Sequence, residues 1–403
     1  MSKYRLTYFQ PRALAECSRL VLHYAGQEFE DVRLSHDELP TLKDSLPYGQ
    51  IPLLEVDGQK ICQSGAIVRF LANRFGLNGK NEFETAKADE IYGFFYDSIR
   101  SHMPYNAARL GLTPDADTKK LHQEVFLPAA RKALPVYDNL IKWSTSGFLL
   151  PGGLSYIDFV VAEHLHTIFL MEPQFAEEYP SLTKFKNKIH TLPQIADYVR
   201  QRPNTISFED HRITKKQWLA MKDSTFYGKI PILEVDGLFS YSHINNLRVI
   251  GKPLAQCYAI SRYLAKQFGL IGADDWEAAK LDEVADFHKG VHTELSPYIF
   301  VISGYRRGDR DALRKDVFIP IVEKNFPIYV NLLKQSTSGF FGRNNVTWID
   351  FLVSEYMSTI KHYEPVIMEK YPLITKFIEK VQSLPQIKDY IKSRAQTPLQ
   401  VQY

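Results

Sequence analysis

The sequence predicts a mixed α/β domain followed by an all-helical domain, with this pair repeated and the second α/β domain incomplete. Two observations carry the prediction. Strand-like and helix-like hydrophobic patterns alternate up to about residue 79, whereas only helical periodicity is found from 82 to 200. The segment 48–58 then recurs almost unchanged at 227–237, which indicates an internal repeat.

The first domain is predicted to contain four strands and three helices. In chain order they span 3–9, 15–25, 29–34, 37–46, 53–56, 60–62 and 64–75. The helix at 15–25 is expected to end at Gly26, because glycine readily adopts the left-handed conformation that closes a helix. Asp57–Gly58 predicts a tight hairpin between the last two strands. These elements would form a small mixed sheet covered by helices.

The following region is expected to be a helical bundle. Its periodicity is interrupted at Pro104, Pro114, Gly147 and Pro180. Ser155–Asp158 precedes an apolar run and is typical of a capping box at a helix N-terminus. Thr347–Asp350 is its counterpart in the second repeat, and we interpret both as structural.

The two repeats are not equivalent. Ser144–Phe148 recurs as Ser336–Phe340, so the offset grows from 179 near residue 48 to 192 here. The additional residues fall at 238–251, either as a real loop or as a translated intron. Nothing in the second repeat matches residues 1–28. We therefore expect a distorted or borrowed second sheet, with domains at 1–79, 81–205, 206–271 and 273–403.

Composition excludes several classes of protein. The 403 residues carry a formal net charge of +3, too small to predict binding to nucleic acid or to an anionic membrane. The most apolar stretch, 159–171, contains Glu163, His164 and His166, and no segment reaches the length that crosses a membrane. Three cysteines without metal-ligand spacing favour the reducing cytoplasm.

Three motifs in the first repeat together resemble the glutathione S-transferases, and most closely the sigma class. They are Tyr8–Arg12 with Ala15–Glu16, the segment 48–58, and Gln63–Ile67. The resemblance covers essentially all of residues 1–205. It implies a thioredoxin-like N-terminal domain followed by the family's helical domain, with glutathione as co-substrate and no metal. Residues 206–398 resemble the same family without its opening strand and helix.

The resemblance implies a role for Tyr8 as the catalytic residue, donating a hydrogen bond to the glutathione sulfur. Pro52 resembles the family's cis-proline, which would present Ile51 to the glutathione backbone as an added strand does. Ser64 begins a helix, where free N–H groups favour a carboxylate, and Gln63 would add an amide bond. The remaining implied glutathione-binding residues are Lys43, Gly49, Gln50 and Asp97. In this family, the residue at the position of Asp97 often reaches the glutathione of the neighbouring subunit. Both Lys43 and Asp97 are also consistent with ordinary surface positions.

Some positions depart from the family pattern. Leu39 stands where a tryptophan is usual, which would weaken glutathione binding. The second repeat keeps several glutathione-binding positions, has Cys257 in place of Ser64 and Gly290 in place of Asp97, and lacks the tyrosine strand. It also contains His288 and His292 at helical i, i+4 spacing, but without a third ligand we do not predict a metal site.

The predicted function is conjugation of glutathione to small hydrophobic electrophiles, which would bind near Arg12, Ile99 and Tyr105. Isomerase or peroxidase side activities stay open at this point. The alternative is a non-catalytic relative that binds ligands or serves a structural role, which the truncated repeat and Leu39 favour. As partners we expect a second copy of the chain in a homodimer, or the two repeats paired as an internal pseudo-dimer.

Overall fold

The computed structural model describes most of the chain. Its described residues are 2–10, 12–34, 46–109, 113, 115–202, 256–304 and 306–393, together with the strand backbones at 232–233, 247–249 and 252–255. The expected helix at 37–46 lies outside these residues except for its last position. In the second repeat, the kept glutathione-binding positions between Trp218 and Pro231 lie outside them as well.

The first domain is built on a four-stranded sheet in the order β2-β1-β3-β4. Its strands are β1 (Tyr4–Phe9), β2 (Glu30–Leu34), β3 (Leu53–Val56) and β4 (Gln59–Cys62). β1 pairs in parallel with β2 and antiparallel with β3. A short 3-10 helix (Ala13–Ala15), α1 (Glu16–Tyr24) and α3 (Ser64–Phe75) complete the domain. The thioredoxin-like domain predicted from the sequence is thus confirmed.

The position of β1 explains its composition. It lies inside the sheet, so Tyr4, Leu6 and Tyr8 on one side are all buried, and Thr7 on the other side is buried as well. The hairpin between β3 and β4 turns at Asp57 and Gly58, which have φ angles of 51° and 84°. Two consecutive positive φ values are what a tight type I′ turn requires, as the dipeptide predicted.

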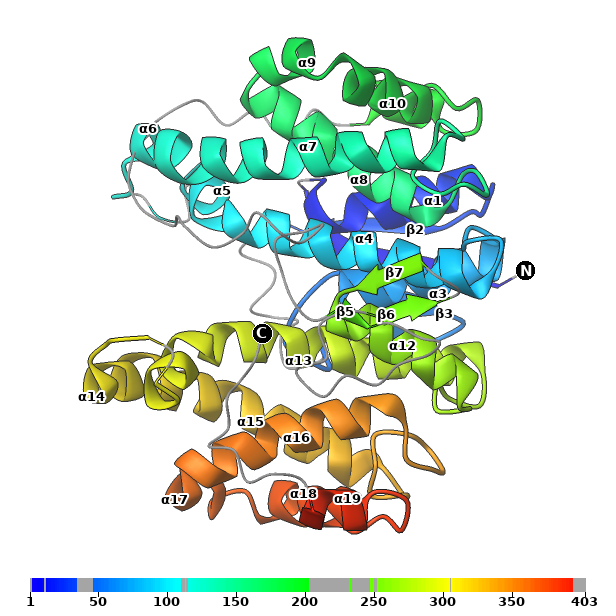
Figure 1. The fold of residues 1–403 in the computed structure, drawn as a ribbon. Coiled ribbons are helices and arrows are strands. Elements are labelled where there is room, and N and C mark those ends of the chain that lie inside the picture. The colour runs from blue at the N-terminus through cyan, green and yellow to red at the C-terminus, as the bar shows by residue number, and fades with distance from the viewer. Residues whose placement is uncertain are drawn as a thin grey trace. The chain divides into compact units, whose positions relative to one another are not determined.

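The first helical domain surrounds α8 (Tyr156–Met171), whose N-terminal half is almost completely buried. α8 packs against α1, α4 and α10 (Figure 1). The other helices are α4 (Glu82–Ser101), α5 (Met103–Arg109), α6 (Thr118–Leu121), a π-helical turn (His122–Phe126), α7 (Leu127–Ser144), α9 (Gln174–Glu178), α10 (Pro180–His190) and α11 (Ala196–Gln201). Because α8 contacts both α1 and the bundle, it joins the sheet domain to the helical domain.

Both predicted capping boxes are present. Asp158 Oδ2 accepts the Ser155 backbone N–H at 2.8 Å, and its Oδ1 accepts the N–H of Leu149 at 2.8 Å. Asp350 repeats this arrangement with Thr347 at 2.7 Å, at the start of α16 (Trp348–Tyr363). The carboxylate therefore ties the helix start to the preceding loop, which is a structural role.

The second repeat has a three-stranded antiparallel sheet in the order β5-β7-β6. Its strands are β5 (Ile232–Leu233), β6 (Leu247–Val249) and β7 (Lys252–Ala255). β6 lies inside the additional segment 238–251, so this segment supplies an edge strand to the sheet. The helices that follow are α12 (Cys257–Gln267), α13 (Asp275–Ile302), α14 (Arg310–Leu313), a π-helical turn (Arg314–Phe318), α15 (Ile319–Gln335), α16, α17 (Pro365–Met368), α18 (Pro372–Gln382) and α19 (Lys388–Ser393).

The chain divides into two compact units that do not coincide with the two repeats. Unit 1 comprises Met1–Leu39, Pro52–Lys60 and Ile67–Tyr263, and unit 2 comprises Pro40–Ile51, Ile61–Ala66 and Leu264–Tyr403. Each unit therefore contains segments from both repeats. None of the described helices is long and apolar enough to cross a membrane.

Candidate active site

Tyr8 lies near the end of β1 and is only 7% exposed. Burial raises the pKa of its hydroxyl, while a hydrogen bond from the backbone N–H of Leu14 and the charge of Arg19 act in the opposite direction. The net effect is upward, so the hydroxyl keeps its proton at neutral pH. A buried phenol that keeps its proton can donate a hydrogen bond to an anion.

The residues at the start of α3 form a second candidate group, which belongs to unit 2. Gln63 has a φ angle of 66°, a backbone conformation that residues other than glycine seldom adopt. Its Nε2 donates to Gln50 Oε1 at 3.0 Å. Gly49, with φ 59°, closes the turn just before Gln50. Strained backbone of this kind is concentrated at functional sites, and here it precedes the N-terminus of a helix, where a carboxylate is favoured.

The same local structure occurs in the second repeat. Gln256 has a φ angle of 74° and immediately precedes α12, as Gln63 precedes α3. Within unit 1, its Nε2 donates to Asp97 Oδ2 at 3.5 Å. Asp97 therefore lies beside the glutamine of the other repeat, and Gln256 shares the positive φ of Gln63.

Arg12 is not placed as expected for a residue that contacts an electrophile. Its side chain is 4% exposed, and its Nη1 donates to Glu163 Oε2 at 3.0 Å. A guanidinium held in a buried ion pair is not available to line a pocket, so this prediction is corrected. Ile99 is half-buried on α4, and Tyr105 is buried against His122 and Phe126, with ring centroids 5.3 and 5.0 Å away.

The remaining candidate residues have structural roles or lie outside the described residues. Lys43 and Leu39 are outside them. His288 Nδ1 lies 2.8 Å from the Tyr329 hydroxyl, and the ring of His292 lies against Tyr356. Across the residues that the structure describes, no group of three or more histidine, cysteine or acidic side chains could hold a metal ion.

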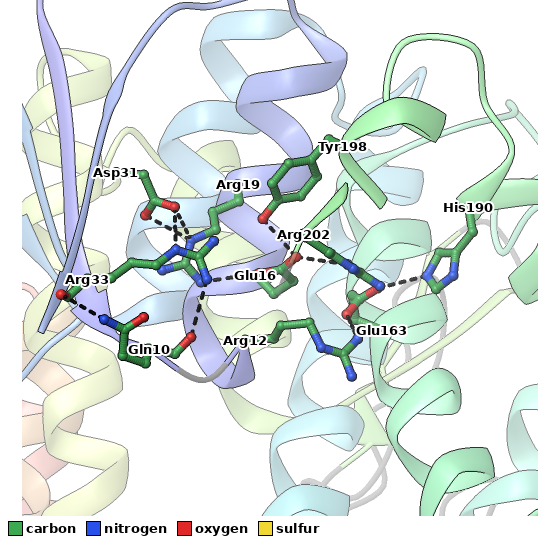
Figure 2. A network of polar contacts seen from close by, with 10 residues as sticks. All are labelled: Gln10, Arg12, Glu16, Arg19, Asp31, Arg33, Glu163, His190, Tyr198 and Arg202. Carbon is green, nitrogen blue, oxygen red and sulfur yellow. Dashed lines mark hydrogen bonds and ion pairs between the residues drawn. The ribbon is translucent and has the colours of Figure 1, made fainter. Parts of the chain in front are cut away.

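A network of polar contacts, buried at its centre, links α1, α8 and α11, and sequence reasoning did not find it (Figure 2). Figure 2 shows its ten residues: Gln10, Arg12, Glu16, Arg19, Asp31, Arg33, Glu163, His190, Tyr198 and Arg202. At its centre Arg202 contacts Glu16 and Glu163, each at 2.8 Å. The sequence feature that could have revealed this network is Glu163, an acidic residue inside the most apolar stretch of the sequence.

Two models of known protein domains match this chain. The model of the glutathione S-transferase C-terminal domain matches residues 102–202 and 292–394, together just over half of the chain. The model of the N-terminal domain matches residues 4–73. The chain belongs to the glutathione S-transferase family. The C-terminal model matches twice, once in each repeat defined above.

Individual relatives align with about half of this glutathione S-transferase-family chain. A probable glutathione S-transferase 6 of Caenorhabditis elegans is 39% identical over 47% of this chain and 86% of its own length. Glutathione S-transferase 1 of Ascaris suum is 37% identical over 51% of this chain and 99% of its own. A solved Nu-class enzyme of Haemonchus contortus is 37% identical, with a TM-score of 0.47 over 51% of this chain and 100% of its own. The sigma-class assignment made from the motifs stays a prediction.

Proposed function

We propose that the first repeat adds the thiolate of glutathione to small hydrophobic electrophiles, with Tyr8 donating a hydrogen bond to the sulfur. The supporting observation is Tyr8 itself, a buried phenol that keeps its proton at the end of the strand where the family's active tyrosine is expected. Arg19 and the Leu14 N–H moderate the effect of burial on its pKa, which makes the hydroxyl a better donor.

The free energy needed to favour the thiolate is about that of one strong hydrogen bond. A thiol with a pKa near 8.5 is only about 3% ionised at pH 7, and lowering that pKa by ~2 units requires ~2.7 kcal/mol of preferential stabilisation of the thiolate. A hydrogen bond to a charged group contributes roughly 1.5–3 kcal/mol. Tyr8 alone could therefore make the thiolate the main species.

The group around Gln63 is proposed to bind the peptide part of glutathione. Ser64 and the N-terminus of α3 would take the γ-glutamyl carboxylate, and Gln63 would add an amide contact. Gly49, Gln50 and Ile51 would face the peptide backbone, with Lys43 at the glycyl carboxylate. We place the electrophile near Ile99 and Tyr105. Cys17, Cys62 and Cys257 are not joined in disulfides, which suits the cytoplasm as the location.

We also propose that the two repeats pair within one chain. In unit 1, β7 of the second repeat contacts α4 of the first, and Gln256 reaches Asp97. In unit 2, the ring of Tyr48 from the first repeat lies 4.9 Å from that of Phe287. Each compact unit thus combines parts of both repeats, as paired subunits of one dimer would. A homodimer formed by the first repeat alone would not account for these contacts.

Replacing Tyr8 by phenylalanine tests the proposed chemistry. We expect kcat for conjugation of an aryl halide to fall by at least tenfold, because the thiolate loses a bond of roughly 1.5–3 kcal/mol. Tyr4→Phe is the matched control, since Tyr4 is equally buried on the same strand and side. Equal rates in wild type and Tyr8→Phe would reject the role of Tyr8, whereas glutathione binding without turnover in the wild type would favour the non-catalytic alternative.

A further inference from the structure

Each repeat contains a π-helical turn at the same place in its sequence. Leu121–Phe126 of the first repeat recurs as Leu313–Phe318 of the second, and in both copies the π-helical turn ends at the phenylalanine. A tyrosine that follows a proline packs against this phenylalanine. It is Tyr105 in the first repeat and Tyr298 in the second, with ring centroids 5.0 and 4.7 Å apart. The two turns therefore have closely similar surroundings.

The first residue of the turn differs between the repeats. Arg314 in the second repeat binds Glu364, the residue directly after α16, through Nε to Oε1 and Nη2 to Oε2, both at 2.8 Å. In the first repeat His122 takes this place, and its Nε2 lies 3.3 Å from Oε2 of Glu172, directly after α8. Arginine is always charged, whereas the ordinary pKa of histidine is near 6.5. The same ion pair is therefore permanent in the second repeat and depends on pH in the first.

His122 also contacts the tyrosine of its own repeat. Its ring lies 5.3 Å from that of Tyr105 and is stacked on that of Phe126 at 5.3 Å. Because Tyr105 packs against both rings, the position of the imidazole is part of the surface that holds Tyr105. The carboxylate of Glu172 attracts that imidazole strongly only while it is protonated.

Other titratable groups near the turn do not change charge in the same pH range. Histidine is the side chain whose ordinary pKa lies between 5 and 8, and burial lowers the pKa of His102, whose ring lies 5.7 Å from that of Phe126, to about 4. Asp158, whose pKa burial raises to about 6, lies in the first turn of α8, at the opposite end from Glu172. The charged residues on the turn and on the elements packed against it are Glu124, Arg109 on α5, Lys119 and Lys120 on α6, and Arg131 on α7, which pairs with Glu178 on α9.

We propose that His122 is a positioning residue for Tyr105, and that its ion pair with Glu172 makes the electrophile end of the first site pH-dependent. Below about pH 6.5 the imidazole is charged and Glu172 holds it against Tyr105. As pH rises above that value the charge is lost, and the attraction falls to that of a neutral hydrogen bond. The contact of Tyr105 with the electrophile rests on the proposed function, whereas the pH-dependent packing of Tyr105 does not.

The first test measures hydrogen exchange of residues 103–109 in the full chain without ligand, at about pH 5.5 and 7.5, relative to the intrinsic exchange rate at each pH. In wild type we expect about two- to fivefold greater protection at the lower pH, the effect of one partly exposed ion pair. His122→Arg copies the second repeat and should keep the greater protection at both pH values, whereas His122→Gln should keep the smaller. Arg314→His is the reciprocal variant, and it should introduce the same pH dependence at residues 298–302.

The comparison of these variants decides whether His122 is responsible. Loss of the pH dependence in His122→Gln, together with its appearance in Arg314→His, supports the proposal. A pH dependence that persists in His122→Gln, or that is absent from the wild type, overturns it, because the protonation of His122 would then not act on Tyr105. This readout requires neither glutathione nor turnover.

The second test compares the binding of glutathione with that of S-hexylglutathione, which carries an unreactive apolar chain, by calorimetry at the same two pH values. The ratio of the Kd for glutathione to the Kd for the conjugate reports on the chain alone. In wild type we expect this ratio to be about two- to fivefold larger at the lower pH, because Tyr105 is then held in place, and in His122→Arg to be independent of pH.

This second test separates the positioning role from the proposed function with Tyr105→Leu. A wild-type ratio that is independent of pH, although Tyr105→Leu lowers it, rejects the positioning role of His122. A ratio that Tyr105→Leu leaves unchanged shows that the apolar chain binds elsewhere, and rejects the placement of the electrophile in the proposed function instead.

Discussion

Glu283 is a carboxyl group buried completely on α13. Burial raises its pKa to about 7, although Lys280 and a hydrogen bond from the Cys62 backbone favour the charged form. The folded chain therefore holds a proton here at pH values where the unfolded chain, with an ordinary glutamate, has released it. The resulting stabilisation is present below the unfolded pKa and is lost as pH rises toward 7.

Glu283→Gln should remove this pH dependence. The difference between about 7 and the ordinary value of 4.5 corresponds to roughly 2–4 kcal/mol lost by the wild type between pH 4.5 and 7. Urea unfolding over that range should show wild-type stability declining relative to the variant. Glu294→Gln, on the more exposed surface of the same helix, should keep the wild-type slope. Parallel curves for wild type and Glu283→Gln would contradict the expectation.

Among the helices and strands, α3 gives the most direct functional prediction, which concerns its first residues. Gln63 carries the strained φ of 66°, and Ser64 is the first residue of the helix. A hydroxyl and unpaired N–H groups at a helix N-terminus are suited to a carboxylate.

Ser64→Ala should therefore weaken glutathione binding. Losing one hydrogen bond to a charged group, worth roughly 1.5–3 kcal/mol, corresponds to at least a tenfold rise in Kd. Calorimetric titration with glutathione measures this directly. Ser64→Thr keeps the hydroxyl and should bind nearly as wild type does. An unchanged Kd in Ser64→Ala would show that the γ-glutamyl carboxylate of glutathione does not bind at the start of this helix.

The sequence was most informative about the bounds of individual strands and helices. The strand predicted at 53–56 and the helix predicted at 64–75 have those same bounds in the structure. Local patterns suffice for such elements, because their bounds are marked by neighbouring residues such as the Asp57–Gly58 turn. The resemblance likewise led to Tyr8 and Gln63. The ion network was missed, since Arg202 and Glu16 are separated by 186 positions and no local period connects them. Arg12 was misassigned for the same reason.

At the scale of the whole molecule, the two units each combine both repeats. The contact of Gln256 with Asp97 lies within unit 1 and that of Tyr48 with Phe287 within unit 2, and each joins residues of the two repeats. The repeat relates the pair Gln256 and Asp97 to a second pair, because Gln256 corresponds to Gln63 and Asp97 corresponds to Gly290.

Internal pairing predicts a single chain in solution. Light scattering should give a mass near 46.5 kDa at micromolar concentration. Asp97→Arg, which places a longer, positively charged side chain beside Gln256, should loosen the pairing and raise the measured mass or hydrodynamic radius, whereas Asp115→Arg in the loop before α6 should not. A wild-type mass of twice this value would show that chains pair with one another.

The place of Arg202 in the chain also has a consequence for synthesis on the ribosome. Domains generally fold as they emerge, N-terminal part first. The strand with Tyr8 is made among the first residues, yet Arg202, the partner of Glu16 and Glu163, is made near the end of the first repeat. Until Arg202 leaves the exit tunnel, those two carboxylates cannot be buried with their full countercharge. Completion of the first repeat therefore waits for Arg202, near its end, at a time when the chain of the second repeat has already begun to be made.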